Sequence, residues 1–175
     1  MDILIDKTYF YGNIAIPDKN EEGSNLERAM VQYQREFLRK VLGDHYYLLT
    51  ETANLSETYT EIYKAIYGTA FEVNSENFIY DGLVNKAENK SAIANYVFIK
   101  YQEERIQSND SFGLSEANST ELSTKMPFVN RIAEVKREIE ATVYRLYDYI
   151  YYSGDPFWSL FNFPFTEKNA NSWQI

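Results

Sequence analysis

The chain has 175 residues, with 17 lysines and arginines against 26 aspartates and glutamates, one histidine and no cysteine. Its length suits one domain with a core large enough to fold unaided. The lack of cysteine excludes disulfides, thiolate metal sites and cysteine nucleophiles, and a single histidine excludes the multi-histidine centres of most zinc and iron enzymes. A formal net charge of -9 argues against a general nucleic-acid binder, which needs cations to neutralise phosphates.

Aromatic residues make up 17% of the chain, with 16 tyrosines, 11 phenylalanines and 2 tryptophans. Tyrosine and tryptophan favour surfaces that are apolar on one side and wet on the other, as subunit interfaces are. A tyrosine-rich core is an equally good explanation of the same composition. The two interpretations are compatible, and the composition leaves both open.

No segment resembles a targeting or membrane element. The first seven residues are too short and too acidic for a signal peptide. The most apolar stretch, 156–165, is far shorter than the roughly 20 residues that a membrane-spanning helix needs. We therefore expect a soluble protein that is made in the cytoplasm and has no membrane partner.

The first 17 residues are predicted to be extended. An aromatic run covers 9–11, Gly12 favours a turn, and the segment ends at Pro17. We interpret 1–17 as an N-terminal arm or a small hairpin, followed by a polar linker over 18–25.

The first helix is predicted from a capping pattern and an apolar stripe. Ser24, with Glu27 three residues later, matches a capping box that satisfies otherwise unpaired amides at a helix start. Gly43 is typical of a helix end. The stripe expected to face the core consists of Leu26, Met30, Tyr33, Phe37 and Val41.

Two shorter helices and a hairpin are predicted next. Residues 45–52 favour a short helix, and Asn54 is a suitable cap for another that ends at Gly68. Within 69–82, β-branched and aromatic residues flank a polar turn at 74–77. This pattern predicts a β-hairpin inserted between helices.

Two longer helices follow, separated by a polar segment. Ser91 is predicted to open a helix that runs to about Gln107, and Pro127 to start the longest helix, which runs to about Tyr152. Between them, 108–125 is polar and aperiodic, which predicts a long loop that is functional or mobile. The apolar seam of the last helix, expected in the core, consists of Ile132, Val135, Ile139, Val143, Leu146 and Ile150.

These elements predict a mainly α protein. It would be a compact multi-helix bundle of four to five helices, the longest near the C-terminus, with a small β-hairpin insert and an extended N-terminal arm. We expect one helical domain over 1–152 and an aromatic C-terminal tail over 153–175.

The sequence offers no set of residues typical of catalysis. His45 is predicted to occupy a helix start or a hydrogen-bonded interface rather than to act as a general base. No carboxylate lies in an apolar run that would raise its pKa for acid–base chemistry. A faint calcium-loop pattern at 109–111 and Glu116 is better explained by a solvated loop. We expect no enzymatic activity, metal or cofactor.

Apolar residues near both ends of the chain are candidate contacts with neighbouring subunits or a portal protein. An arm can add a strand to a neighbour, and buried aromatic anchors carry much of the energy of an interface. The alternative, left open, is that the tail folds back and completes the chain's own core. The candidate residues are Ile3, Ile5, Tyr9, Phe10, Tyr11, Phe157, Trp158, Phe161, Phe163, Phe165 and Trp173.

Five segments together carry a family resemblance: 5–17, 36–46, 82–86, 90–101 and 113–118. In this order they resemble a family of small virion proteins of tailed phages and prophages of Bacteroidetes bacteria, the crAss-like phages among them. That family is similar to head–tail connector proteins, also called neck or portal-adaptor proteins. The second and fourth segments, separated by the hairpin insert, are the most specific.

The resemblance implies a helical protomer without catalysis that assembles in about twelve copies as a ring beneath the portal. Such a ring would sit at the virion neck, bridge portal and tail, contact other neck or tail proteins and line the DNA passage. A negative charge is compatible with this role, because it lets genomic DNA slide past without specific binding.

Other functions stay open beside this one. A tail-completion or stopper protein lower in the neck would differ only by its position in the particle. A carbohydrate-binding module, suggested by aromatic faces and many carboxylates, is the remote alternative. A single-stranded nucleic-acid binder is disfavoured, because the basic residues of 131–145 alternate with glutamates. In the neck, the polar loop could project into the lumen as a gate or clamp. Its candidate residues are Asp110, Phe112, Glu116 and Glu121.

Overall fold

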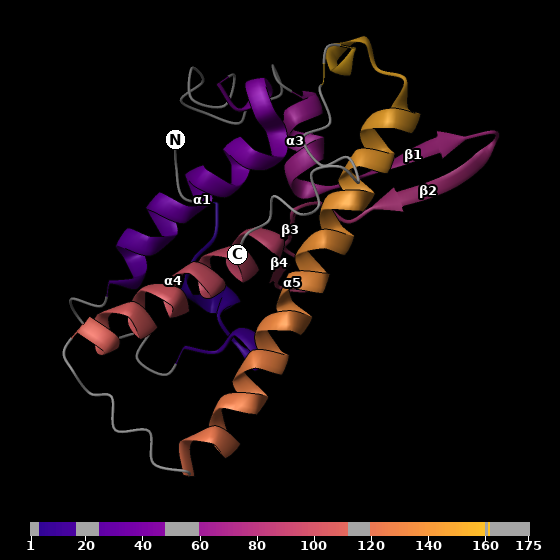
Figure 1. Cartoon of the computed structure of the whole chain (residues 1–175). Helices are drawn as coiled ribbons and strands as arrows, with labels where there is room; N and C mark the ends of the chain where they lie inside the picture. Colours follow the sequence, from indigo (N-terminus) through magenta and orange to yellow (C-terminus); the bar gives the residue numbers. More distant parts are fainter. Residues whose placement is uncertain (1–3, 17–24, 48–59, 112–119, 160, 162–175) are drawn as a thin grey trace.

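The computed structural model describes residues 4–16, 25–47, 60–111, 120–159 and 161, and for 106–111 and 120–129 it describes the backbone only. The fold is mainly helical with a small projecting hairpin, which confirms the predicted fold class (Figure 1). The described helices are α1 (Leu26–Leu42), α3 (Thr60–Tyr67), α4 (Ala92–Ser111) and α5 (Thr120–Ser153). The strands are β1 (Thr69–Val73), β2 (Glu76–Tyr80), β3 (Val84–Asn85) and β4 (Lys90–Ser91).

The α1 helix buries the apolar stripe that the sequence predicts, and all five stripe residues are buried. Its end at Gly43, where the backbone φ is 55°, is also confirmed. The predicted capping box is not seen at its start. The helix begins at Leu26 with Asn25 at the N-cap position, and no side chain caps it there. Ser24 lies outside the described residues.

The α4 helix lies in the centre of the bundle, in contact with α1 on one side and α5 on the other. Ser91 caps it as predicted, because its Oγ accepts hydrogen bonds from the amides of Ile93 and Ala94. Residues 93–98 are all buried except Asn95, which is partly buried. The helix continues to Ser111, past the predicted end. Burial on several faces explains why its apolar residues do not form a single stripe.

The α5 helix begins at Thr120, so the predicted start at Pro127 is wrong. Residues 121–126 include glutamate, leucine, lysine and methionine, which favour helix, and their propensity extends the helix in front of the proline. The predicted loop at 108–125 is therefore helical at both ends, and 112–119 lie outside the described residues. The seam of α5 is buried as predicted, except that Ile132 is only partly buried.

The predicted hairpin is confirmed as the antiparallel pair β1–β2. Its turn is shorter than predicted, because β2 already begins at Glu76 and only Asn74 and Ser75 connect the strands. Both turn residues have positive φ, 52° and 68°, as a two-residue turn that matches the strand twist requires. The hairpin projects beside the C-terminal part of α5 (Figure 1).

The N-terminal segment differs from the predicted extended arm. Residues 4–16 contain two 3-10 turns, Lys7–Tyr9 and Gly12–Ile14, and lie against the helices. Polar side chains of the bundle hold its backbone: Gln34 accepts from the Leu4 amide at 2.7 Å, and Arg131 donates to the carbonyls of Asn13 and Ala15. Within the described residues, this segment makes no strand pairing, so the hairpin alternative is wrong. None of the helices described has the length and apolar character needed to cross a bilayer.

Candidate assembly surface

Exposed apolar side chains gather on the hairpin and on the last turns of α5. We call them the hairpin–α5 surface. Its residues are Phe78, Ile79, Tyr144, Tyr151 and Tyr152, which are between 43% and 77% exposed. Tyr144 and Tyr151 are seven residues apart and share one side of α5, whereas Tyr152 is turned by about 100° from Tyr151 and lines the groove described next. A cluster of this kind on a folded protein marks a contact site.

A groove of about 420 Å³ lies within this surface, between the hairpin and α5. The hairpin contributes Phe71, Val73, Asn74, Phe78, Ile79 and Tyr80 to its lining, and α5 contributes Arg145, Asp148 and Tyr152. The walls are thus apolar on the strand side, with one cation and one anion on the helix side. Such a groove can accept an apolar side chain and, at its rim, a charged one.

The alternation of side chains along the strands decides which residues enter this groove. Phe71 and Phe78 are cross-strand partners with ring centroids 5.9 Å apart, and Phe71 also contacts Tyr149 of α5 at 5.5 Å. Ile79, one residue further along β2, also borders the groove, but the alternation along a strand turns its side chain toward the opposite face of the hairpin. The sequence signal for this surface is that β2 is apolar on both faces, although only one face can meet α5. None of the contact residues predicted from the sequence lies on this surface.

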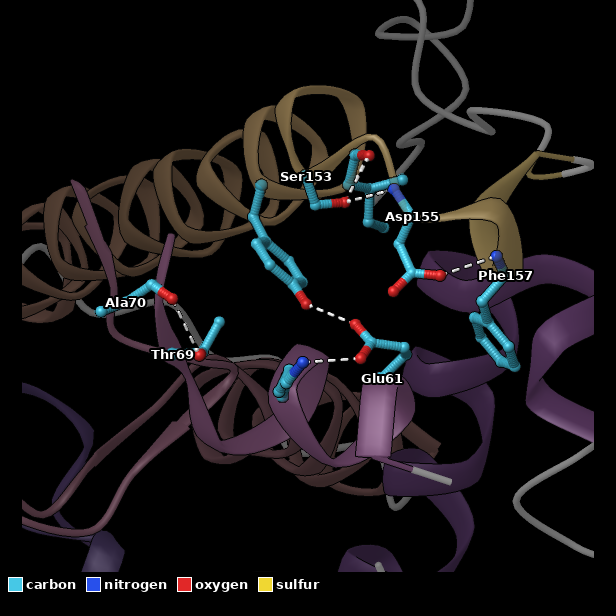
Figure 2. Close-up of polar contacts among 9 residues, drawn as sticks. Glu61, Thr69, Ala70, Ser153, Asp155 and Phe157 are labelled. Carbon is cyan, nitrogen blue, oxygen red and sulfur yellow. Dashed lines mark hydrogen bonds and ion pairs between the residues drawn. The ribbon is translucent and has the colours of Figure 1, made fainter. Parts of the chain in front are cut away.

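A cluster of three polar side chains, which we call a brace, joins the end of α5 to α3 (Figure 2). Tyr149 donates to Glu61 Oε2 at 2.9 Å, and Lys64 donates to Glu61 Oε1 at 2.6 Å. Burial and the nearby Glu61 carboxylate both raise the pKa of Tyr149 above its usual value. The phenol therefore stays protonated and keeps donating to Glu61. This brace joins α3 to α5 and fixes one wall of the groove.

A second brace of the same kind joins α1 to α4. Tyr96 donates to Glu36 at 2.7 Å, and Lys40 lies 2.9 Å from Glu36 and 2.8 Å from the Tyr96 hydroxyl. Burial by itself would raise the pKa of Glu36, but the hydrogen bonds from Lys40 and Tyr96 lower it below its usual value. The three groups therefore form one satisfied network, and they stabilise the packing of the two helices.

The structure places most predicted N-terminal contact residues inside the chain's own core. Ile5, Tyr9 and Phe10 are buried, which corrects the expectation that they would be free to anchor a neighbour. Tyr11 is 44% exposed, and its hydroxyl donates to the Glu88 carbonyl. Ile3 lies outside the described residues. The segment is held against the bundle on both sides of these residues: the Leu4 amide donates to Gln34 of α1, and the 3-10 turn Gly12–Ile14 lies against α4 and α5.

The described part of the C-terminal tail also folds back on the protomer. Trp158 and Phe161 are buried, and Phe157 is partly buried. Asp155 caps the 3-10 turn Pro156–Trp158 by accepting from the Phe157 amide, which directs the chain back toward the bundle (Figure 2). For these residues, the own-core alternative is the one observed. The other tail candidates, Phe163, Phe165 and Trp173, lie outside the described residues.

His45 meets the tail at this point. Its ring lies 5.0 Å from that of Trp158 and 5.4 Å from that of Phe161, and its Nε2 is 3.2 Å from the Phe157 carbonyl oxygen. With a carbonyl as its partner, Nε2 is the protonated nitrogen. His45 ends the 3-10 turn Gly43–His45, and its contact is within the protomer rather than between subunits.

The four loop candidates are placed only in part. Asp110 belongs to the last turn of α4, and Glu121 belongs to the first turn of α5. The prediction that these two residues lie in a loop is therefore wrong. Their side chains, and the whole of Phe112 and Glu116, lie outside the described residues. The structure therefore does not bring these four candidates together into a site.

A second depression, of about 430 Å³, lies between the N-terminal segment, the β3–β4 turn and α5. Its lining is about half polar and half apolar and carries charges of both signs, including Asp81, Lys90, Glu138 and Arg145. Arg145 lies 3.4 Å from Asp81, so part of this charge is already paired. Among the residues described, no three histidine, aspartate or glutamate side chains are grouped in a way that could hold a metal ion.

The chain was compared with protein-family models, with curated proteins and with solved structures, and no match was found in any of the three.

Proposed function

We propose that this chain is a structural subunit of a phage head–tail connector, which assembles with its own copies and with a portal protein. The observation that supports an assembly role is the hairpin–α5 surface, where an apolar groove and exposed aromatic side chains lie on the same part of the molecule. Tyrosine and other aromatic side chains are enriched at subunit interfaces. The choice of particle comes from the sequence resemblance.

The segments that carry the resemblance also lie together in space. Within 36–46 and 90–101, Phe37 and Tyr96 contact each other with ring centroids 5.2 Å apart. The 5–17 segment joins them, because its 3-10 turn Gly12–Ile14 lies against α4. Segments that are distant in sequence therefore form one packed unit.

The proposal is tested by assembly with the cognate portal protein. We expect electron microscopy of the purified pair to show a ring-shaped complex, and mass spectrometry to find the chain in purified virions. A chain that forms no ring with the portal and is absent from virions would contradict the proposal. A reconstruction of the neck would also distinguish a portal adaptor from a stopper, because the two differ in which proteins they contact.

The carbohydrate-binding alternative loses part of its support. It requires tryptophan rings that are free to stack on sugars, but Trp158 is buried among aromatic neighbours. Trp173, the other tryptophan, lies outside the described residues. A test remains simple: glycan-dependent quenching of tryptophan fluorescence would favour this alternative over the connector role.

A further inference from the structure

We infer that neighbouring copies of this chain associate head to tail through the two faces of the β1–β2 hairpin. Ile79, on the outer face of one copy, occupies the hairpin–α5 groove of the next copy, and Glu72 of the first meets Arg145 of the second. This inference rests on the proposed connector role and deepens it, because it names the contact between subunits.

The outer face of the hairpin carries an apolar side chain without cover. Ile79 is 77% exposed, the highest value among the large apolar residues described. Its cross-strand partner is Ala70, which is also exposed and too small to cover it. An isoleucine side chain that stays in water forgoes the favourable free energy of transfer to an apolar site. Ile79 is therefore suited to insert into an apolar pocket.

The inner face of the same hairpin provides such a pocket. The groove of about 420 Å³ is lined by Phe71 and Phe78 on one side and by Tyr152 on the other. Its walls are held in place, since Phe71 and Tyr80 both contact the braced ring of Tyr149. A preformed groove loses little conformational entropy when it binds.

One pair of charges beside the two apolar parts is complementary, although Asp148 also lines the groove. Glu72 lies on the same hairpin face as Ile79, is exposed, and forms no ion pair with any residue described. Arg145 lines the groove, and its side chain is 66% exposed while it contacts Asp81 at 3.4 Å. A second carboxylate can therefore approach this guanidinium, which has five N–H donors.

The placement on opposite faces also determines the symmetry of the contact. Two copies related by a two-fold axis would use the same patch on both, whereas here two different patches meet. Such a heterologous contact leaves one free Ile79 face and one free groove after each addition. Repetition with the correct rotation closes a ring, which is the assembly expected of a connector.

Cross-linking between single-cysteine variants tests the inference. The chain has no native cysteine, so introduced thiols are the only ones present. Ile79→Cys and Tyr152→Cys are produced with different tags, mixed, and treated with a short bis-maleimide, which also traps weak contacts. We expect a cross-linked dimer that contains both tags, and only background cross-linking when either variant is treated alone.

A matched control replaces Ile79→Cys with Ala87→Cys, an exposed position in the β3–β4 turn. This control should give background yields with Tyr152→Cys. Absence of the mixed dimer above that background would overturn the inference, and so would an Ile79→Cys homodimer of equal yield, which indicates a two-fold contact. In a second measurement, Ile79→Ser should abolish ring formation on the portal, whereas Asn77→Ser, on the same face, should preserve it.

The two proposals fail in different ways. A wild-type ring on the portal without the mixed cross-link overturns the hairpin contact and leaves the connector role intact. A mixed cross-link without any ring, in a chain that is absent from virions, overturns the connector role and leaves the contact between copies.

Discussion

The rings of Tyr80 and Tyr149 stack almost in parallel, with centroids 5.4 Å apart and an angle of 6° between their planes. Tyr80 ends β2 and donates to the Ala65 carbonyl of α3 at 2.8 Å, while Tyr149 donates to Glu61 of the same helix. This pair therefore joins the hairpin, α3 and α5 at one point. The position of the groove depends on it.

Tyr149→Ala should destabilise the protein strongly. The substitution removes a buried ring and leaves a cavity, so we expect the free energy of unfolding to fall by about 3–5 kcal/mol in urea titrations. Tyr149→Phe keeps the ring and loses only the hydrogen bond to Glu61, which should cost about 1 kcal/mol. Tyr151→Ala, at a position that is 69% exposed, is the control and should change stability by less than about 0.5 kcal/mol. Equal losses for Tyr149→Ala and Tyr151→Ala would contradict the stack.

Gly82→Ala should be far more harmful than Gly12→Ala. A Cβ at Gly82 would lie 2.5 Å from the Gly68 amide nitrogen and 2.5 Å from the Tyr67 carbonyl carbon, and these backbone atoms cannot move aside. We expect a loss above about 3 kcal/mol. At Gly12, φ is also positive, but nothing lies within 4 Å of the added atom, so the loss should be about 1–2 kcal/mol. Thermal unfolding of both variants measures the difference, and a Gly82→Ala variant as stable as Gly12→Ala would refute it.

Arg131→Ala should loosen the N-terminal segment without unfolding the bundle. Its guanidinium donates to the Asn13 and Ala15 carbonyls and lies 4.9 Å from the centre of the Phe98 ring. Hydrogen bonds from a charged donor contribute about 1.5–3 kcal/mol. Hydrogen–deuterium exchange should therefore become faster in peptides that cover 12–16. Arg137→Ala, on the exposed side of the same helix, should leave that exchange rate unchanged; faster exchange in both variants would point to a general effect on α5.

Alkaline pH should destabilise the protein through its buried tyrosines. Burial is the main cause that raises their pKa above the ordinary value of 10.0, and nearby carboxylates add to it for several of them. In the unfolded chain these phenols ionise first, so above pH 10 the unfolded state binds fewer protons and the free energy of unfolding falls as the pH rises. The tyrosines concerned are Tyr33, Tyr80, Tyr96, Tyr147 and Tyr149.

Absorbance of tyrosinate during a pH titration measures this effect. We expect a first transition from exposed tyrosines and a second, later one that coincides with unfolding. Tyr96→Phe should reduce the second transition only, because it removes one late-ionising group. A single transition near pH 10 that includes every tyrosine of the folded protein would contradict the burial of these side chains.

Helix positions were predictable where one local signal acts alone. The stripe from Leu26 to Val41 and the seam from Val135 to Ile150 follow the 3.6-residue period, and both are buried. Ser91 and Gly43 marked a helix start and a helix end correctly, since capping depends on neighbouring residues. Pro127 misled the prediction because proline is unfavourable inside a helix and typical of its first turn, whereas α5 begins at Thr120 and continues through the proline.

The sequence by itself determined the helical class, the hairpin and the buried faces of α1 and α5, because hydrophobic period and turn residues act over a few positions. It could not determine which apolar residues lie in the core. Phe10, Trp158 and Ile79 are all apolar, yet the first two are buried and the third is 77% exposed. That difference depends on which distant surfaces meet, and only the tertiary structure decided it: the N-terminal segment and the tail cover the bundle, whereas the outer hairpin face has no described segment to cover it.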